Sequence, residues 1–168
     1  MNETTTATAT ATRAELRAEL EAAQARFHDL VARIGEAHWK QRSGIPAWTC
    51  GQLAWHVGGS VAFVTGQVEG AKKGKALNPP SLLMPLLLKA SELRVRIASR
   101  KATPASVLAD FDAGMVRALS VLDATDEREL GVTVRAFNET QTLGELFRSI
   151  PGHVAEHTAH IEHVLAAP

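Results

Sequence analysis

The apolar residues between Arg13 and Ile34 recur at steps of three and four, and this spacing is the feature that most constrains how the chain can fold. Charged residues fill most of the other positions, so only one face of the segment can enter a core. The same spacing returns after Thr103, an N-cap that a first-turn proline follows, and after Thr142, which can form a capping box with Glu145. Thr49 can begin a further helix through a capping box with Gln52. The pattern predicts four substantial helices: 13–36, 49–70, 104–123 and 143–166.

The rest of the chain supplies connections and one weaker helical segment. Ser81–Ser99 also has helical spacing, with Pro85 restricting where a helix can begin, and residues 132–137 alternate enough for a short extended piece. Residues 1–12 are mostly threonine and alanine without an apolar period, which predicts a disordered N-terminal tail. The remaining 13–168 suffices for one domain with a sizeable core. We therefore expect an all-α fold, a single four-helix bundle with long connections between its helices.

Charge and composition argue against several kinds of partner. The chain has 18 basic and 18 acidic residues, so it lacks the positive excess that a non-specific nucleic-acid binder needs. The longest apolar run, Leu82–Leu88, is broken by Pro85 and is too short to cross a bilayer. The single cysteine permits no intramolecular disulfide, and no signal-peptide pattern is visible. We expect a cytoplasmic protein that acts on a small molecule, with no nucleic-acid or membrane partner; a homodimer stays open.

Histidines are concentrated near the C-terminus, where four of the seven occur between 153 and 163. A helix advances about 100° per residue, so His153, His157 and His160 form one stripe while His163 points to the side. Two imidazoles at i and i+4 can direct their nitrogens at one metal ion. His56 is expected to face the core of the bundle, and it is the candidate for a third ligand from a facing helix. The sequence thus predicts a histidine triad that binds metal: His56, His153 and His157.

The other candidate residues have less specific interpretations. His28 and His38 are interpreted as structural or exposed, and His160 either replaces His157 as a ligand or supports the site from outside it. Cys50, in the first turn of its predicted helix, is either a thiol activated by the helix dipole or a small packing residue, and packing is favoured. The sequence contains no glycine-rich phosphate-binding loop and no recognisable pattern of a serine–histidine–aspartate catalytic triad.

With these residues identified, the sequence resembles the DinB/YfiT-like superfamily of metal-binding four-helix bundles. One matching segment, from Pro46 to Val57, reads Pro-Ala-Trp-Thr-Cys-Gly-Gln-Leu-Ala-Trp-His-Val, a helix start that leads to a histidine. The other comprises 142–147 and the histidine run 153–161. The resemblance implies that His56, His153 and His157 are metal ligands and that His160 flanks them. The proline–glycine pair at 151–152 departs from a regular last helix, and could bend it.

The expected function follows from the metal site and the resemblance together. Three neutral imidazoles leave a position on the ion for water or for a substrate thiolate. Some members of the superfamily are isomerases or transferases that use mycothiol, bacillithiol or glutathione. We therefore expect a divalent-metal-dependent enzyme, either a thiol-dependent S-transferase or isomerase, or a hydrolase. The alternative is a non-catalytic metal-binding or stress-response bundle.

The identity of the metal follows only in outline from its ligands. Imidazole is a suitable ligand for zinc, nickel, copper and iron, and of these we favour zinc or nickel. The expected co-substrate is a low-molecular-weight thiol. Binding should weaken below about pH 6, because imidazole ligates when neutral and its ordinary pKa is about 6.5.

Overall fold

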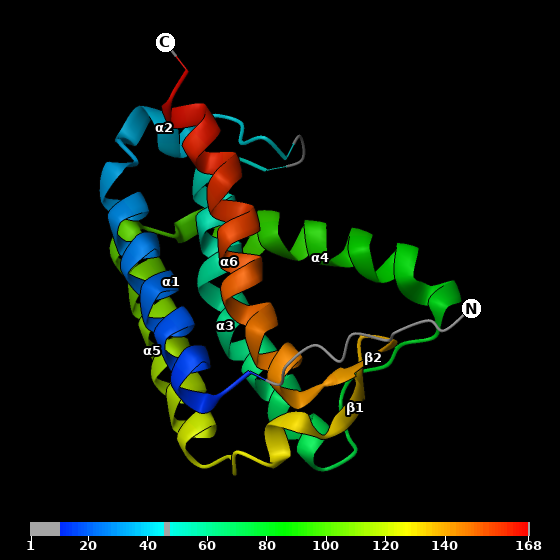
Figure 1. Cartoon of the computed structure of the whole chain (residues 1–168). Helices are drawn as coiled ribbons and strands as arrows, with labels where there is room; N and C mark the ends of the chain where they lie inside the picture. The colour runs from blue at the N-terminus through cyan, green and yellow to red at the C-terminus, as the bar shows by residue number, and fades with distance from the viewer. Residues whose placement is uncertain (1–10, 46–47, 168) are drawn as a thin grey trace, which may run out of the picture.

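Four helices form the body of the molecule in the computed structural model, which describes residues 11–45 and 48–167. They are α1 (Arg13–Arg33), α3 (Cys50–Lys72), α5 (Pro104–Asp123) and α6 (Leu143–Leu165). Helices α5 and α6 each pack against both α1 and α3, so the four helices make a closed bundle (Figure 1). The expected all-α four-helix bundle is confirmed.

Local sequence signals set most of the helix starts. The side chains of Thr12, Thr49, Thr103 and Thr142 each accept a hydrogen bond from the backbone N–H three residues ahead, as N-cap residues do. The capping boxes predicted for the second and last helices are both present. The segment predicted as 104–123 is helical throughout. The first helix differs from its prediction, because it ends at Arg33 and a short helix, α2 (Glu36–Lys40), follows.

The last helix runs without a restart through Pro151, which is buried inside it. Proline has no N–H, so the carbonyl four residues earlier, on Phe147, loses its usual partner within the helix. Helix α6 nevertheless continues to Leu165 and keeps His153 and His157 one turn apart on the same helical face. The proline–glycine pair therefore does not divide the segment that carries the predicted ligands.

Two smaller elements lie outside the bundle. Helix α4 (Met84–Ala98), flanked by the 3-10 turns Ser81–Leu83 and Ser99–Lys101, projects sideways from the bundle and leaves many of its apolar side chains exposed (Figure 1). Strands β1 (Thr133–Ala136) and β2 (Glu139–Thr142) form an antiparallel hairpin that a 3-10 turn (Glu129–Gly131) precedes. The expected extended piece near 132–137 is β1; its partner strand was not predicted.

The interior of the bundle is one cluster of apolar side chains drawn from all four helices. Phe27 of α1 and Phe111 of α5 meet at its centre, with ring centroids 4.2 Å apart and both side chains fully buried. Among the described residues, no helix is long and apolar enough to cross a membrane.

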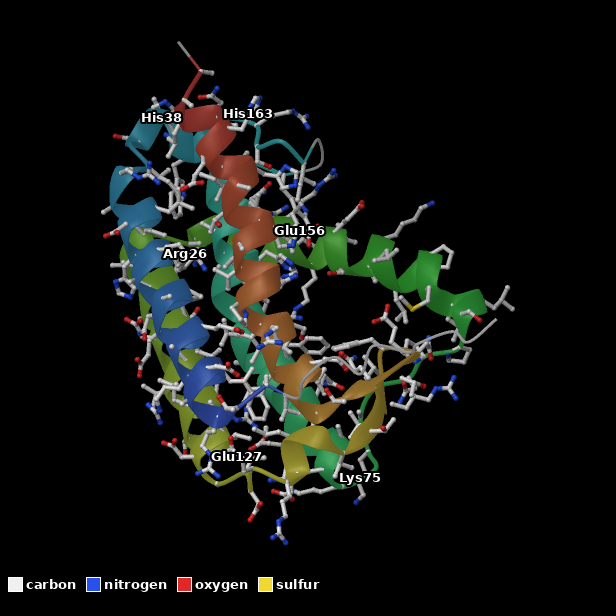
Figure 2. The ribbon with its side chains drawn as sticks, in the orientation of Figure 1. Arg26, His38, Lys75, Glu127, Glu156 and His163 are labelled. Carbon is white, nitrogen blue, oxygen red and sulfur yellow. The ribbon has the colours of Figure 1, made fainter. Side chains whose placement is uncertain are left out.

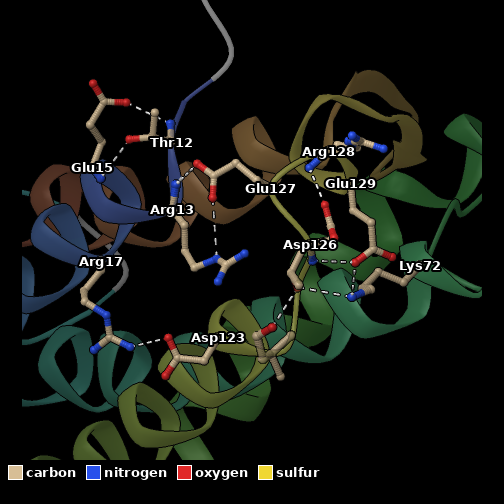
Figure 3. Close-up of polar contacts among 12 residues, drawn as sticks. Thr12, Arg13, Glu15, Arg17, Lys72, Asp123, Asp126, Glu127, Arg128 and Glu129 are labelled. Atoms are coloured by element: carbon tan, nitrogen blue, oxygen red, sulfur yellow. Dashed lines mark hydrogen bonds and ion pairs between the residues drawn. The ribbon is translucent and has the colours of Figure 1, made fainter.

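Polar contacts fasten the start of α1 to the chain that follows α5 (Figure 3). The backbone N–H of Arg13 donates to the carboxylate of Glu127 at 2.9 Å, and Lys72 of α3 binds Glu129 at 3.0 Å. Ala11 is buried and Thr12 caps α1, so these two residues of the predicted tail have defined positions. Residues 1–10 of that tail lie outside the described structure.

Candidate metal centre

The three predicted ligands come together where α3 packs against α6. His56 lies in the second turn of α3, and His153 and His157 lie one turn apart on α6. The Nε2 atoms of His56 and His153 are 3.2 Å apart although 97 residues separate them in sequence. One ring nitrogen from each of the three residues lies within 4.8 Å of the other two. The predicted juxtaposition is therefore present; metal binding by these residues stays a prediction.

The imidazoles are arranged around a shared centre. Ring centroids are 4.3 Å apart for the pair on α6, and 5.2 Å and 5.1 Å from His56 to His153 and His157. The ring planes meet at 69° to 87°, so edges rather than faces approach. Two nitrogens on one tetrahedral zinc ion lie about 3.3 Å apart at ordinary Zn–N bond lengths. The 3.2 Å separation of the two Nε2 atoms fits this spacing.

Burial makes the cluster a set of neutral bases. Burial, with smaller contributions from the neighbouring His153, His157 and Arg94, lowers the pKa of His56 to about 4. The pKa of His157 is also lowered to about 4, chiefly by burial, and that of His153 is lowered for the same reason. All three are therefore unprotonated at neutral pH, which is the form that binds metal.

A buried nitrogen of the cluster has no hydrogen-bond partner among the described residues. Within the described part of the chain, Nδ1 of His157 is buried and unpaired. An unsatisfied buried polar atom is costly, so such groups commonly bind an ion or a further ligand. The neutral donor set, its spacing and this unpaired nitrogen all fit a borderline metal such as zinc.

The remaining histidines lie outside the three-residue cluster. His160 has its ring centroid 6.5 Å from that of His157, and its side chain fills the space beside Gly44. His163 lies near the C-terminal end of α6, at the end of the bundle that also carries His38 (Figure 2). His28 contacts the carboxylate of Asp112 at 2.7 Å, in keeping with its structural interpretation.

Cys50 is fully buried at the start of α3, and burial raises the pKa of its thiol. The helix N-terminus thus does not make it an activated nucleophile. The structure favours the packing interpretation of this residue.

Two features of the site were not predicted. Trp48 is buried with its ring centroid 4.9 Å from that of His56, so an indole covers one side of the cluster. A cleft of about 990 Å³ opens beside the cluster, and both His56 and His153 line it. Arg94 of α4 and Phe137 of the hairpin also line this cleft. No short sequence signal identifies them, because their elements reach the site only through tertiary packing.

Comparison with known proteins gives two matches. The DinB superfamily matches residues 19–161. The crystal structure of the mycothiol-dependent maleylpyruvate isomerase is similar to this fold with a TM-score of 0.68 and 14% sequence identity, over 90% of this chain. This chain spans only 61% of the length of that structure. No curated protein sequence matches the chain.

Proposed function

Because the chain belongs to the DinB superfamily, we propose that it is a metal-dependent enzyme that transfers or isomerises a small molecule with the help of a low-molecular-weight thiol. The observation that carries the proposal is the convergence of His56, His153 and His157 beside a large cleft, which the first two of them line. A closed structural metal site would need no such cleft. The volume of about 990 Å³ is in the range of small-molecule sites.

Thiol chemistry is favoured over hydrolysis by the likeness of the fold to a mycothiol-dependent isomerase. A divalent ion, with zinc or nickel preferred, would supply Lewis acidity that favours the thiolate form of a bound thiol. His56, His153 and His157 would hold that ion, and their low pKa values keep them available as ligands at neutral pH. Trp48 shields one side of His56 from water. The protein is proposed to work in the cytoplasm, where such thiols are kept reduced.

The ligand set is tested by measuring the metal content of protein purified without an affinity tag. His56→Ala and His157→Ala should each lose most of the bound metal, because two imidazoles hold an ion far less well than three. His163→Ala is the matched control and should retain it. His160→Ala should cause at most a modest loss, since its ring lies outside the cluster. Full metal content in folded His56→Ala and His157→Ala proteins would falsify the site.

The reaction class is tested with the zinc-loaded protein and the same variants. Thiol consumption is followed with mycothiol, bacillithiol or glutathione and a panel of electrophilic small molecules. We expect turnover with at least one thiol, lost in His157→Ala and kept in His163→Ala. Turnover that needs no thiol but releases a hydrolysis product would instead place the protein among the hydrolases.

A further inference from the structure

The cleft beside the histidine cluster carries two kinds of chemistry that the proposed function does not use. Arg94, on α4, brings a positive charge close to the cluster, as its lowering effect on the pKa of His56 indicates. Phe63 of α3 and Phe137 of the hairpin form an apolar wall of the same cleft. Their ring centroids are 6.1 Å apart.

The guanidinium of Arg94 has no acidic partner among residues 11–45 and 48–167. No acidic side chain in the described chain lies within ion-pair distance of it, although nine other ion pairs are present there. Asp110 of α5 lines the same cleft, but it does not pair with Arg94 and does not contribute to the shifted pKa of His56. Glu156 of α6 also acts on His153 and His157, but it does not line the cleft, so Arg94 is the cation that the cleft offers to a ligand. A guanidinium binds carboxylates through two parallel hydrogen bonds.

Phe137 is held in an unusual backbone conformation. It has a φ of 56° and Asn138 has a φ of 67°, so both turn residues of the hairpin have positive φ. Such a two-residue turn normally carries asparagine or glycine, and a bulky side chain is strained there. The N–H of Phe137 donates to the carbonyl of Leu77 at 2.8 Å, and the side chain of Asn138 donates to the carbonyl of Pro79 at 2.6 Å. These bonds hold the strained turn and keep its phenyl ring beside Phe63.

We propose that the cleft binds an organic acid with an apolar body, whose carboxylate pairs with Arg94 and whose body packs against Phe63 and Phe137. Its use as a substrate rests on the proposed function, but its binding does not. Either the electrophilic substrate or the thiol co-substrate can supply the carboxylate, and the experiment below separates these sources.

The test measures binding to the zinc-loaded protein by calorimetry with two matched probes, 4-phenylbutanoate and the uncharged 4-phenylbutanamide. Wild type should prefer the acid by about tenfold or more, which is the size expected for a hydrogen bond to a charged group. Arg94→Gln should lose that preference and still bind the amide, and Arg94→Lys should recover part of it. Arg96→Gln, on the same helix but outside the cleft wall, is the control and should behave as wild type.

The apolar wall has its own variants. Phe63→Ala and Phe137→Asn should weaken both probes to a similar degree, because both carry the phenyl group. Asparagine adopts positive φ readily, so Phe137→Asn keeps the turn while removing the ring. Unchanged binding of both probes in both variants would overturn the apolar part of the proposal.

Two further measurements identify the source of the carboxylate and the role of the metal. The affinity of wild type for glutathione is compared with its affinity for the diethyl ester of glutathione, which lacks the free carboxylates. If wild type prefers glutathione and Arg94→Gln does not, Arg94 is confirmed as the anion site and the thiol supplies the carboxylate. Repeating the titrations on chelator-treated protein excludes direct binding of the probe to zinc. An acid preference that is equal in wild type and Arg94→Gln refutes the proposal, whereas failure of zinc loading or thiol turnover counts only against the proposed function.

Discussion

Burial changes the proton affinity of the clustered imidazoles. The ordinary pKa of histidine led to the expectation that metal binding would weaken below about pH 6. With the pKa of His56 and His157 lowered to about 4, protons compete with metal only at lower pH. The site should therefore keep its metal under mildly acidic conditions in which an exposed histidine site would release it.

The same pKa shifts predict how the stability of the metal-free protein depends on pH. Between about pH 4 and pH 6.5 the unfolded chain binds more protons than the folded chain, because His56 and His157 have a pKa near 4 only when buried. The free energy of unfolding from these groups is therefore highest above pH 6.5 and falls as pH drops through that window. Thermal melts should show a smaller loss between pH 7 and pH 5 in His56→Gln than in wild type. His163→Gln is the control, and an equal loss in all three proteins would contradict the shifts.

At the scale of the helices, close packing between α3 and α5 positions His56. A Cβ on Gly114 of α5 would lie 3.0 Å from the backbone nitrogen of Ala62, and one on Gly58 of α3 would lie 3.0 Å from the carbonyl oxygen of Val107. Backbone atoms cannot move aside as a flexible side chain can. The two glycines thus set the distance between these helices, and α3 in turn presents His56 to α6.

Glycine substitutions in these helices should therefore have opposite effects. Gly114→Ala is expected to destabilise the protein by about 1–3 kcal/mol, because it overpacks the contact between α3 and α5. Gly66→Ala should stabilise it by about 0.5–1 kcal/mol, because a Cβ there meets nothing within 4 Å in the described structure and alanine favours helix. Urea unfolding followed by circular dichroism measures both, and a stabilised Gly114→Ala protein would contradict the packing argument.

At the scale of the whole molecule, the histidine cluster connects the second and last helices of the bundle. His56 belongs to α3, whereas the other two members belong to α6. A metal ion that is bound by all three histidines can bind only when α3 and α6 are packed against each other. Binding should therefore favour the folded state over the unfolded one.

Zinc should consequently raise the melting temperature. A ligand at 100 times its Kd stabilises the folded state by about 2.7 kcal/mol. We expect a rise in the melting temperature of wild type on adding zinc and its reversal by a chelator. His56→Ala and His157→Ala should show little of this rise, while His163→Ala should behave as wild type. An equal rise in His56→Ala would mean that zinc binds elsewhere.

The sequence by itself determined the four helices of the bundle and part of the site. Helix starts depend on hydrogen bonds between residues three apart, and helix faces depend on periodicity, so the capping boxes at Thr49 and Thr142 and the i, i+4 pair on α6 were predictable. The sequence predicted less well where α1 ends, at Arg33, and that α6 continues through Pro151. Tertiary contacts compete with local helix preference at both places.

Only the tertiary structure decided what surrounds those elements. His56 was a candidate because of its core-facing position, but its 3.2 Å approach to His153 depends on how α3 packs between α5 and α6. The placement of Arg94 on the projecting helix α4, and of Phe137 on a strained turn, likewise depends on contacts between segments far apart in sequence. The physical reason is range: a cap or a helical face is specified within a few residues, whereas a cleft is made by the packing of the whole chain.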